Sequence, residues 1–150
     1  MHALRLNNNV RQHYASGMSE HKIKDRWVMP ESSARLSSLL GLAYEPLMQD
    51  WELQCADSHR IREFLDLYEH GNLSDDDRFA LMSLIVASCD DWISDAGTDE
   101  QVLQRVRRCL VAGFSLHEAT IFYWCLLSET DLDNVFSITP FMREIWRQLR

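Results

Sequence analysis

The sequence predicts an all-α protein, a compact bundle of five to seven helices in which most neighbours are antiparallel. The chain has five glycines and three prolines among its 150 residues, and they lie between apolar blocks instead of inside them. Apolar side chains recur at the spacing i, i+3, i+4 and i+7 that is typical of amphipathic helices. The stretches between these blocks are short, and short connections join antiparallel helices.

Composition, length and periodicity predict one globular domain, preceded by an N-terminal segment that lacks the helical pattern of the domain. Hydrophobic residues make up 46% of the chain and charged residues 25%, which is ordinary for a folded domain. Residues 1–29 have little periodicity, and we expect a basic, loosely ordered leader there. Residues 30–150 are expected to form a single helical domain. The longest apolar run, IFYWCLL at 121–127, is far shorter than the ~20 residues that span a bilayer.

The N-terminus and the cysteines indicate a cytoplasmic protein. The first residues, MHALRLNNNVRQHYASG, contain no hydrophobic signal core. Cys55, Cys89, Cys109 and Cys125 show no C-x-x-C spacing, so they do not indicate a zinc or redox site. We expect four reduced thiols that pack as small apolar residues.

Helix start and stop signals divide the first half of the domain. The first helix is expected to begin near Pro30, because proline suits the first helical position, and to end before Gly41. Residues 44–56 are amphipathic, and a loop, a short helix and a strand all remain open for them. The next helix has an i, i+3, i+4, i+7 apolar pattern that starts at Ile61, and it ends at Gly71.

A long helix is expected between residues 75 and 95. Ser74 followed by Asp77 resembles a capping box, and acidic residues in the first turn suit the helix dipole. Apolar side chains cover so much of this helix that we expect it to be central, with only a narrow strip of small and acidic residues uncovered. Asp90 and Asp91 point about 100° apart, so they are not expected to form a self-contained catalytic or metal-binding pair. Asp90 is the better candidate for an internal salt bridge or cap, and Asp91 for the exposed strip.

Three paired signals mark the helices of the second half. They are Thr98 with Gln101, Ser115 with Glu118, and Thr139 with Pro140. The first of these helices stops at Gly113. The second leads from its cap into the run ATIFYWCLL, which has strand propensity but is expected to be helical because of its cap and its helical neighbours. Its consecutive Phe122, Tyr123 and Trp124 indicate either a central buried helix or an exposed aromatic anchor for a protein partner.

Charge is distributed unevenly along the chain. The net charge is −8, with +3 on residues 1–30 and −11 on residues 31–150. An acidic body repels nucleic acid and anionic membranes and attracts a basic partner, although solubility alone also explains it. The basic cluster RVRR at 105–108 is expected to pair with carboxylates such as Asp90 or Asp91 and not with nucleic acid.

No motif indicates catalysis, a metal or a cofactor. The chain lacks a G-x-S-x-G elbow, a phosphate-binding glycine loop and the Glu-x-x-His pair of a di-metal bundle. His59, His70 and His117 are scattered and are expected at the surface or at helix ends. We therefore predict no catalytic residue, no metal ligand and no cofactor. A metal-dependent enzyme built from converging carboxylates and histidines is the alternative.

The predicted partner-binding surface combines acidic residues, which steer a basic protein into contact, with an aromatic anchor. Its residues are Asp75, Asp76, Asp77, Asp90, Asp91, Trp92, Asp95, Asp99 and Glu100.

Two segments carry a resemblance to a known class of protein. ADSHRIREFLDLYEHGNLSDDDRFALMSLIVASCDDWI and LHEATIFYWCLLSETDLDNVFSITPFMREIW resemble the small, acidic, all-helical immunity proteins that bacteria make against secreted toxins. The resemblance is one of general character and covers roughly residues 44–150. It implies a non-enzymatic, antitoxin-like inhibitor that binds a basic toxin or effector and blocks its active site. A structural homo-oligomer that pairs through the C-terminal helix is a further alternative.

Overall fold

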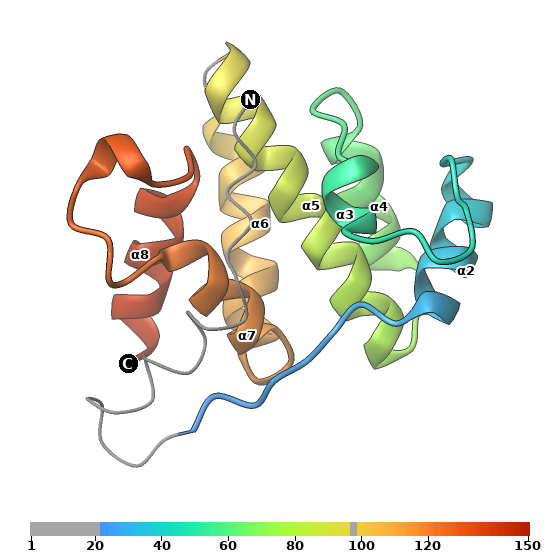
Figure 1. The fold of residues 1–150 in the computed structure, drawn as a ribbon, viewed down its shortest axis with the longest axis horizontal. Coiled ribbons are helices and arrows are strands. Elements are labelled where there is room, and N and C mark those ends of the chain that lie inside the picture. Colours follow the sequence, from blue (N-terminus) through green and yellow to red (C-terminus); the bar gives the residue numbers. More distant parts are fainter. Residues whose placement is uncertain (1–21, 97–98) are drawn as a thin grey trace.

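The computed structural model describes residues 22–96 and 99–150, and this part of the chain is all-helical, as predicted (Figure 1). It contains seven α-helices and one short 3-10 helix, and no strand among the described residues. The helices are α2 (Pro30–Leu40), α3 (Trp51–Gln54), α4 (Ile61–His70), α5 (Asp75–Ala96), α6 (Glu100–Ala112), α7 (Phe114–Cys125) and α8 (Thr139–Leu149), with the 3-10 helix η2 at Leu132–Asn134. They form a compact bundle in which α5 and α6 run in opposite directions (Figure 1).

Glycines end three of the helices at the predicted positions. Gly41 follows α2 in the left-handed conformation, with a φ of 64°, which glycine adopts without strain. Gly71 follows α4, and Gly113 follows α6. These stops confirm the boundaries expected from the sequence.

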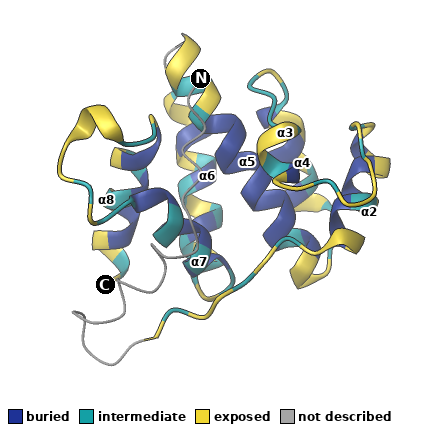
Figure 2. Cartoon of the chain, in the orientation of Figure 1, coloured by how far each residue is buried: buried dark blue, intermediate teal, exposed yellow. Residues whose placement is uncertain are grey.

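Helix α5 is the centre of the bundle. It packs against α2, α3, α4 and α7, and all of its residues from 79 to 89 are buried (Figure 2). The strip expected to stay uncovered is itself partly buried, since Ala80 is 0% exposed and Ala87 2% exposed. Ser83 and Ser88 satisfy their buried hydroxyls by donating to the carbonyls of Phe79 and Leu84, one turn earlier.

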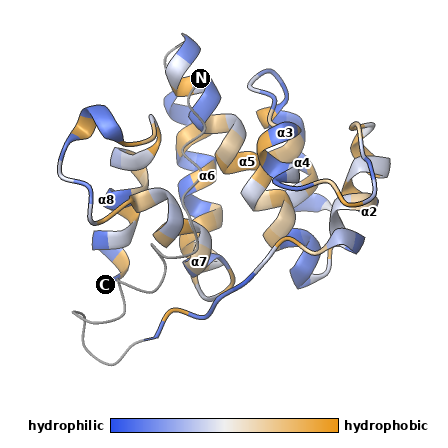
Figure 3. Ribbon diagram, viewed as in Figure 1, coloured by the Kyte–Doolittle hydropathy of each residue, from blue (hydrophilic) through white to orange (hydrophobic). Residues whose placement is uncertain are grey.

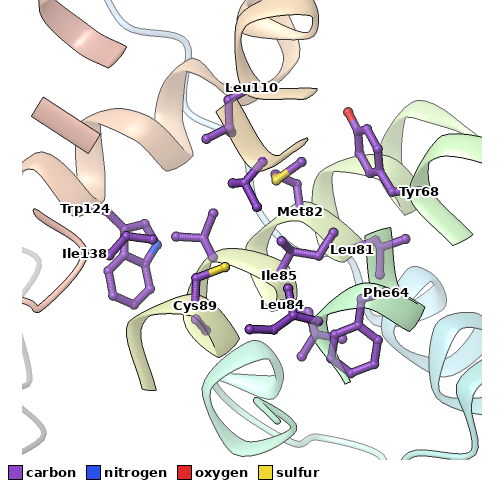
Figure 4. Close-up of a cluster of buried hydrophobic side chains, with 14 of the residues drawn as sticks. Phe64, Tyr68, Leu81, Met82, Leu84, Ile85, Cys89, Leu110, Trp124 and Ile138 are labelled. Atoms are coloured by element: carbon purple, nitrogen blue, oxygen red, sulfur yellow. The ribbon is translucent and has the colours of Figure 1, made fainter. Parts of the chain in front are cut away.

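The core forms one continuous cluster around α5. Figure 4 shows side chains of α4 (Phe64, Tyr68), α6 (Leu110) and α7 (Trp124) converging on those of α5. Burial of this apolar surface is the main contribution to the stability of the fold. The middle of α5 is accordingly hydrophobic, whereas its end that leads to α6 is mostly hydrophilic (Figure 3).

Helices α7 and α8 pack against each other, and α7 also packs against α5. The buried residues of α8 include Met142, Ile145 and Trp146. The end of α7 is bound by Arg143 of α8, whose guanidinium donates to the carbonyls of Cys125, Leu126 and Glu129 at 2.7–2.8 Å. A side chain from the next helix thus satisfies carbonyls that have no partner within α7.

Two predicted helix starts are wrong in detail. Ser115 is inside α7, which begins at Phe114 directly after Gly113 and has no side-chain cap. Thr139 is the first residue of α8 instead of its cap, and its hydroxyl donates to the carbonyl of Trp124. Both residues carry the sequence signal of a cap, but packing between α6, α7 and α8 sets the actual boundaries.

The remaining start signals have different outcomes. Ser74 accepts a hydrogen bond from the Asp77 N–H at 3.2 Å, which confirms half of the predicted capping box. Thr98 lies outside the described residues, and the cap of α6 is Asp99, which accepts from the Gln101 N–H at 2.9 Å. The open segment 44–56 contains the short helix α3.

The described part of the N-terminal segment, residues 22–29, belongs to no helix. Its Ile23 and Val28 pack against the core, while Trp27 and Met29 are exposed. The four cysteines are free thiols, of which Cys89 and Cys125 are buried. None of the described helices combines the length and the apolar character needed to cross a membrane.

Candidate partner-binding surface

The predicted partner-binding residues lie in two groups at opposite ends of α5. Asp75, Asp76 and Asp77 lie in its first turn, and the others lie in its last two turns or at the start of α6. At 1.5 Å per residue, about 24 Å of helix separates Asp75 from Asp91. The structure therefore forms two patches and does not bring all of these residues together.

Asp77 is bound inside the protein. It is 7% exposed, and its Oδ1 accepts hydrogen bonds at 2.7 Å from both the Ser32 hydroxyl and the Arg35 guanidinium. Arg35 also donates to Oδ2 at 3.2 Å. Hydrogen bonding from Arg35, together with that from Ser32 and Ser74, holds the pKa of Asp77 below its usual value. This carboxylate joins α2 to α5 and is not presented to a partner.

Asp76 and Asp75 lie on the surface beside Asp77. Asp76 accepts a hydrogen bond from Arg26 of the N-terminal segment at 3.0 Å. Asp75 is exposed, and no basic side chain in the described part of the chain forms an ion pair with it. This end of α5 therefore presents one carboxylate that already has a partner and one that has none.

Asp90 connects α5 to α8. Its Oδ1 accepts a hydrogen bond from the Ile138 N–H at 2.9 Å, immediately before the first turn of α8. Burial raises the pKa of Asp90. Asp90 was expected to form an internal salt bridge or cap, and it forms an internal hydrogen bond to the backbone before α8. Asp91 is exposed as expected.

The acids at the start of α6 are partly used by local structure. Asp99 caps α6 and forms an ion pair with Arg62 of α4. Glu100 is exposed and accepts a hydrogen bond from Gln104 one turn later. Their charges add to the field of this end of the molecule, but Asp99 is held by its structural role.

Asp91, Trp92 and Asp95 form the part of the surface that is left available, which we call the Trp92 patch. Asp91 and Asp95 are exposed, and neither forms an ion pair with a basic side chain among the described residues. Partial burial and the charge of Asp95 raise the pKa of Asp91. Two carboxylates one turn apart repel each other, so a cation bound here relieves an unfavourable interaction.

Trp92 is half-buried beside a small pocket. The pocket has a volume of about 160 Å³ and is lined by Ser58, His59, Ile61, Arg62, Trp92 and Val102. The indole packs against the core on one side and borders this concave, mixed surface on the other. An aromatic side chain in such a position has the apolar body and polar edge typical of an interface anchor.

The environment of His117, an ionisable residue, could not be predicted from the sequence. It is 0% exposed, so the expectation of a surface position is wrong, although His117 does lie at a helix end, in the first turn of α7. Its Nε2 lies 2.6 Å from the Tyr68 hydroxyl, and its ring stacks near Phe79 with the centroids 6.4 Å apart. Burial, with the charges of Arg78 and Arg26, lowers the pKa of His117 to about 3. A histidine in the first turn of an apolar run carries no signal that distinguishes this buried state.

The basic cluster of α6 pairs with carboxylates, as expected, but with different ones. Arg105 forms ion pairs with Asp66 at 2.8 Å and Glu69 at 3.1 Å, both in α4. Arg107 pairs with Glu144 of α8 at 3.0 Å. These pairs fasten α6 to its neighbours, and they leave Asp90 and Asp91 out of the cluster.

The aromatic run of α7 is largely internal. Trp124 is 4% exposed, and its ring centroid lies 4.5 Å from that of Phe136. Phe122 is half-buried and packs against Trp146 of α8, and Tyr123 stacks on Phe136. The buried interpretation of this run is therefore the one that fits the structure.

Within residues 22–96 and 99–150, no group of three or more His, Cys, Asp or Glu side chains is arranged to hold a metal ion. The chain has no significant match among protein-family models, curated proteins or solved structures.

Proposed function

We propose that this chain is a non-enzymatic protein-binding module that uses the Trp92 patch to bind a basic protein. The observation that carries the proposal is the end of α5, where the exposed Asp91 and Asp95 form no ion pair among the described residues and Trp92, close to them in the same helix, is half-buried beside a pocket. Most other carboxylates of the predicted surface are occupied within the fold. The Trp92 patch is therefore where two neighbouring carboxylates are left for a partner.

The mechanism follows from these side chains. Asp91 and Asp95, with Glu100 close by in the sequence, attract a basic surface over several ångströms and increase the rate of encounter. Trp92 then loses its remaining contact with water as it packs against the partner. Charge thus sets the association rate, and the aromatic contact sets the lifetime of the complex.

The specific form that we propose is an immunity-type inhibitor of a basic toxin or effector. The resemblance of residues 44–150 to acidic helical immunity proteins supports it, and so does the acidic body of the chain, with a net charge of −11 on residues 31–150. Such an inhibitor needs no catalytic group of its own, because it acts by covering the active site or the substrate entry of the toxin. In this form the protein acts in the cytoplasm, where it meets the toxin.

Affinity capture from cells that make the protein tests the proposal. The intact chain is compared with the double variant Asp91→Asn/Asp95→Asn at low and high salt, and the retained proteins are identified by mass spectrometry. We expect wild type to retain a basic protein at low salt only. With that protein purified, the double variant should bind about tenfold more slowly, because rim charges act mainly on the association rate.

A matched control separates this patch from net charge. The variant Glu45→Gln/Asp133→Asn removes the same charge from two exposed positions elsewhere, and it should bind at nearly the wild-type rate. Equal slowing by both variants, or a retained partner that is not basic, would show that the Trp92 patch is not the binding surface.

A further inference from the structure

The other end of α5 already holds a basic side chain. Arg26, in the extended segment before α2, donates to Asp76 Oδ1 at 3.0 Å. Its guanidinium carbon also lies 5.7 Å from the centroid of the Phe79 ring. Figure 1 shows this segment, in blue, passing below α7 and across the lower end of α5 before it enters α2.

The two contacts of Arg26 suit the planar guanidinium group of an arginine. A carboxylate accepts the N–H groups of the planar guanidinium, and an aromatic ring attracts the same cation through its π face. Phe79 is only 4% exposed and is supported from within by the stacked ring of His117. Asp76 and Phe79 therefore form a firm site for a guanidinium group, which we call the arginine site.

Arg26 fills the arginine site incompletely. Only one of its nitrogens donates to Asp76, whereas a well-placed arginine binds a carboxylate with two parallel hydrogen bonds. Its Nε is buried, and no acceptor lies within reach among the described residues. The adjacent carboxylate of Asp75 is exposed and is not used by Arg26. Asp76 and Asp75 thus retain carboxylate oxygens that Arg26 does not engage.

The segment that carries Arg26 is suited to release. Residues 22–29 belong to no helix or sheet, so no ladder of backbone hydrogen bonds is broken when they leave α5. Their side-chain contacts include the apolar packing of Ile23 and Val28 and the ion pair of Arg26, which is partly exposed and therefore weak. Segments of this kind open at low free-energy cost.

We propose that Arg26 is an internal occupant of the arginine site and that an arginine of a basic protein partner displaces it. The proposal rests on the proposed function for the basic character of the partner, but it concerns the end of α5 opposite to the Trp92 patch. The basic N-terminal segment then acts as a competitor built into the chain. It lowers the apparent affinity of the arginine site for any incoming arginine by the fraction of molecules in which the site is open.

Calorimetric titration of the intact chain with a nona-arginine peptide at low salt tests this competition. Arg26→Ala is compared with Lys24→Ala, which removes the same charge from an exposed position of the same segment. We expect Arg26→Ala to bind the peptide about three- to tenfold more tightly than Lys24→Ala. Adding Asp76→Asn to Arg26→Ala should abolish this gain, and a nona-lysine peptide should show a smaller gain.

Further variants keep the outcomes distinct. Arg26→Lys keeps the charge but loses the planar group, so it should give an intermediate affinity. Equal affinities of the Arg26→Ala and Lys24→Ala proteins would overturn the proposal, because only net charge would then matter. Asp91→Asn/Asp95→Asn tests the other patch: if it leaves capture of the partner unchanged while the Arg26 effect persists, the Trp92 patch fails and the arginine site stands. Slower capture by that double variant without an Arg26 effect would instead support the Trp92 patch and overturn the arginine site.

Discussion

His117 and Tyr68 form a buried pair whose environment opposes protonation of the imidazole. The imidazole Nε2 and the Tyr68 hydroxyl share one hydrogen bond at 2.6 Å. The Nδ1 of the same ring is buried and has no hydrogen-bond partner among the described residues. Burial, with the positive charges of Arg78 and Arg26, opposes a charge on this ring and lowers its pKa to about 3. The folded protein therefore holds His117 neutral.

Replacement of His117 by glutamine should flatten the pH dependence of stability. A histidine in the unfolded chain has an ordinary pKa of 6.5, whereas the pKa of folded His117 is about 3. Between these values only the unfolded chain binds the proton, so wild type loses stability as the pH falls, by about 1.4 kcal/mol per pH unit from this residue. Urea unfolding between pH 7 and pH 4 measures the slope.

The exposed His70 provides the control for this experiment. Its side chain is 77% exposed, so His70→Gln should leave the slope at the wild-type value. His117→Gln is also expected to be less stable at pH 7, because it loses ring packing against Phe79. An unchanged slope in His117→Gln would mean that His117 is not held neutral in the folded state.

The sequence does not reveal which side chains pair with each other across different helices. Asp77 and Arg35 are 42 positions apart, and Tyr68 and His117 are 49 apart. Local patterns report helix periodicity and caps, but the partner of a side chain depends on how helices pack. For this reason the acidic character of these positions could be read from the sequence, while the internal role of Asp77 could not.

At the scale of elements, Asp90 links the end of α5 to the start of α8. Its carboxylate takes the place of a local N-cap by accepting from the Ile138 N–H at 2.9 Å. Asp90→Ala should therefore cost about 1 kcal/mol of unfolding free energy, as the loss of a helix cap does. Chemical denaturation measures this loss, and hydrogen exchange at the Ile138 amide should become faster.

The neighbouring Asp91 is the matched control for Asp90. It is exposed and accepts no described hydrogen bond from another element, so Asp91→Ala should change stability by less than about 0.5 kcal/mol. Equal effects of the two alanine variants would show that the contact to α8 contributes nothing to the fold.

Helix boundaries were predictable wherever a local device sets them. Gly41 and Gly71 directly follow their helices. A glycine after an apolar helical pattern is visible in the sequence, so these two helix ends could be predicted. The start of α7 was not predictable, because it follows α6 after a single residue, Gly113, and its first turn has no side-chain cap. The end of α7 likewise depends on Arg143, a residue of another helix.

For the whole molecule, the position of α5 predicts cooperative unfolding. The helix packs against α2, α3, α4 and α7, so the two halves of the bundle share one core. Ile85 is 0% exposed, and Ile85→Ala should cost about 2–5 kcal/mol. In each of the two proteins, far-UV circular dichroism and tryptophan fluorescence should report the same urea midpoint as each other.

A surface leucine serves as the comparison. Leu132 is 63% exposed, so Leu132→Ala should leave the midpoint nearly unchanged. Two separate transitions in wild type would contradict the shared core and indicate that the halves of the bundle unfold independently.

The fold class was predictable because it depends on periodicity and composition summed over the whole chain. The central position of α5 was also predictable, since a helix that is apolar on most of its faces has to be covered. Which helices cover it was not, because many packing orders satisfy the same pattern. The two patches follow from that order, so they could be located only in the structure.

Arg143 has a consequence for how the protein is made. This one guanidinium donates to the carbonyls of Cys125, Leu126 and Glu129, and the ribosome adds it 18 residues after Cys125. The chain is synthesised from its N-terminus, and a domain generally folds as a unit. The helices from α2 to α6 are therefore made before the carbonyls at the end of α7 gain this donor. The α7–α8 pair is the last part of the bundle to become complete during synthesis.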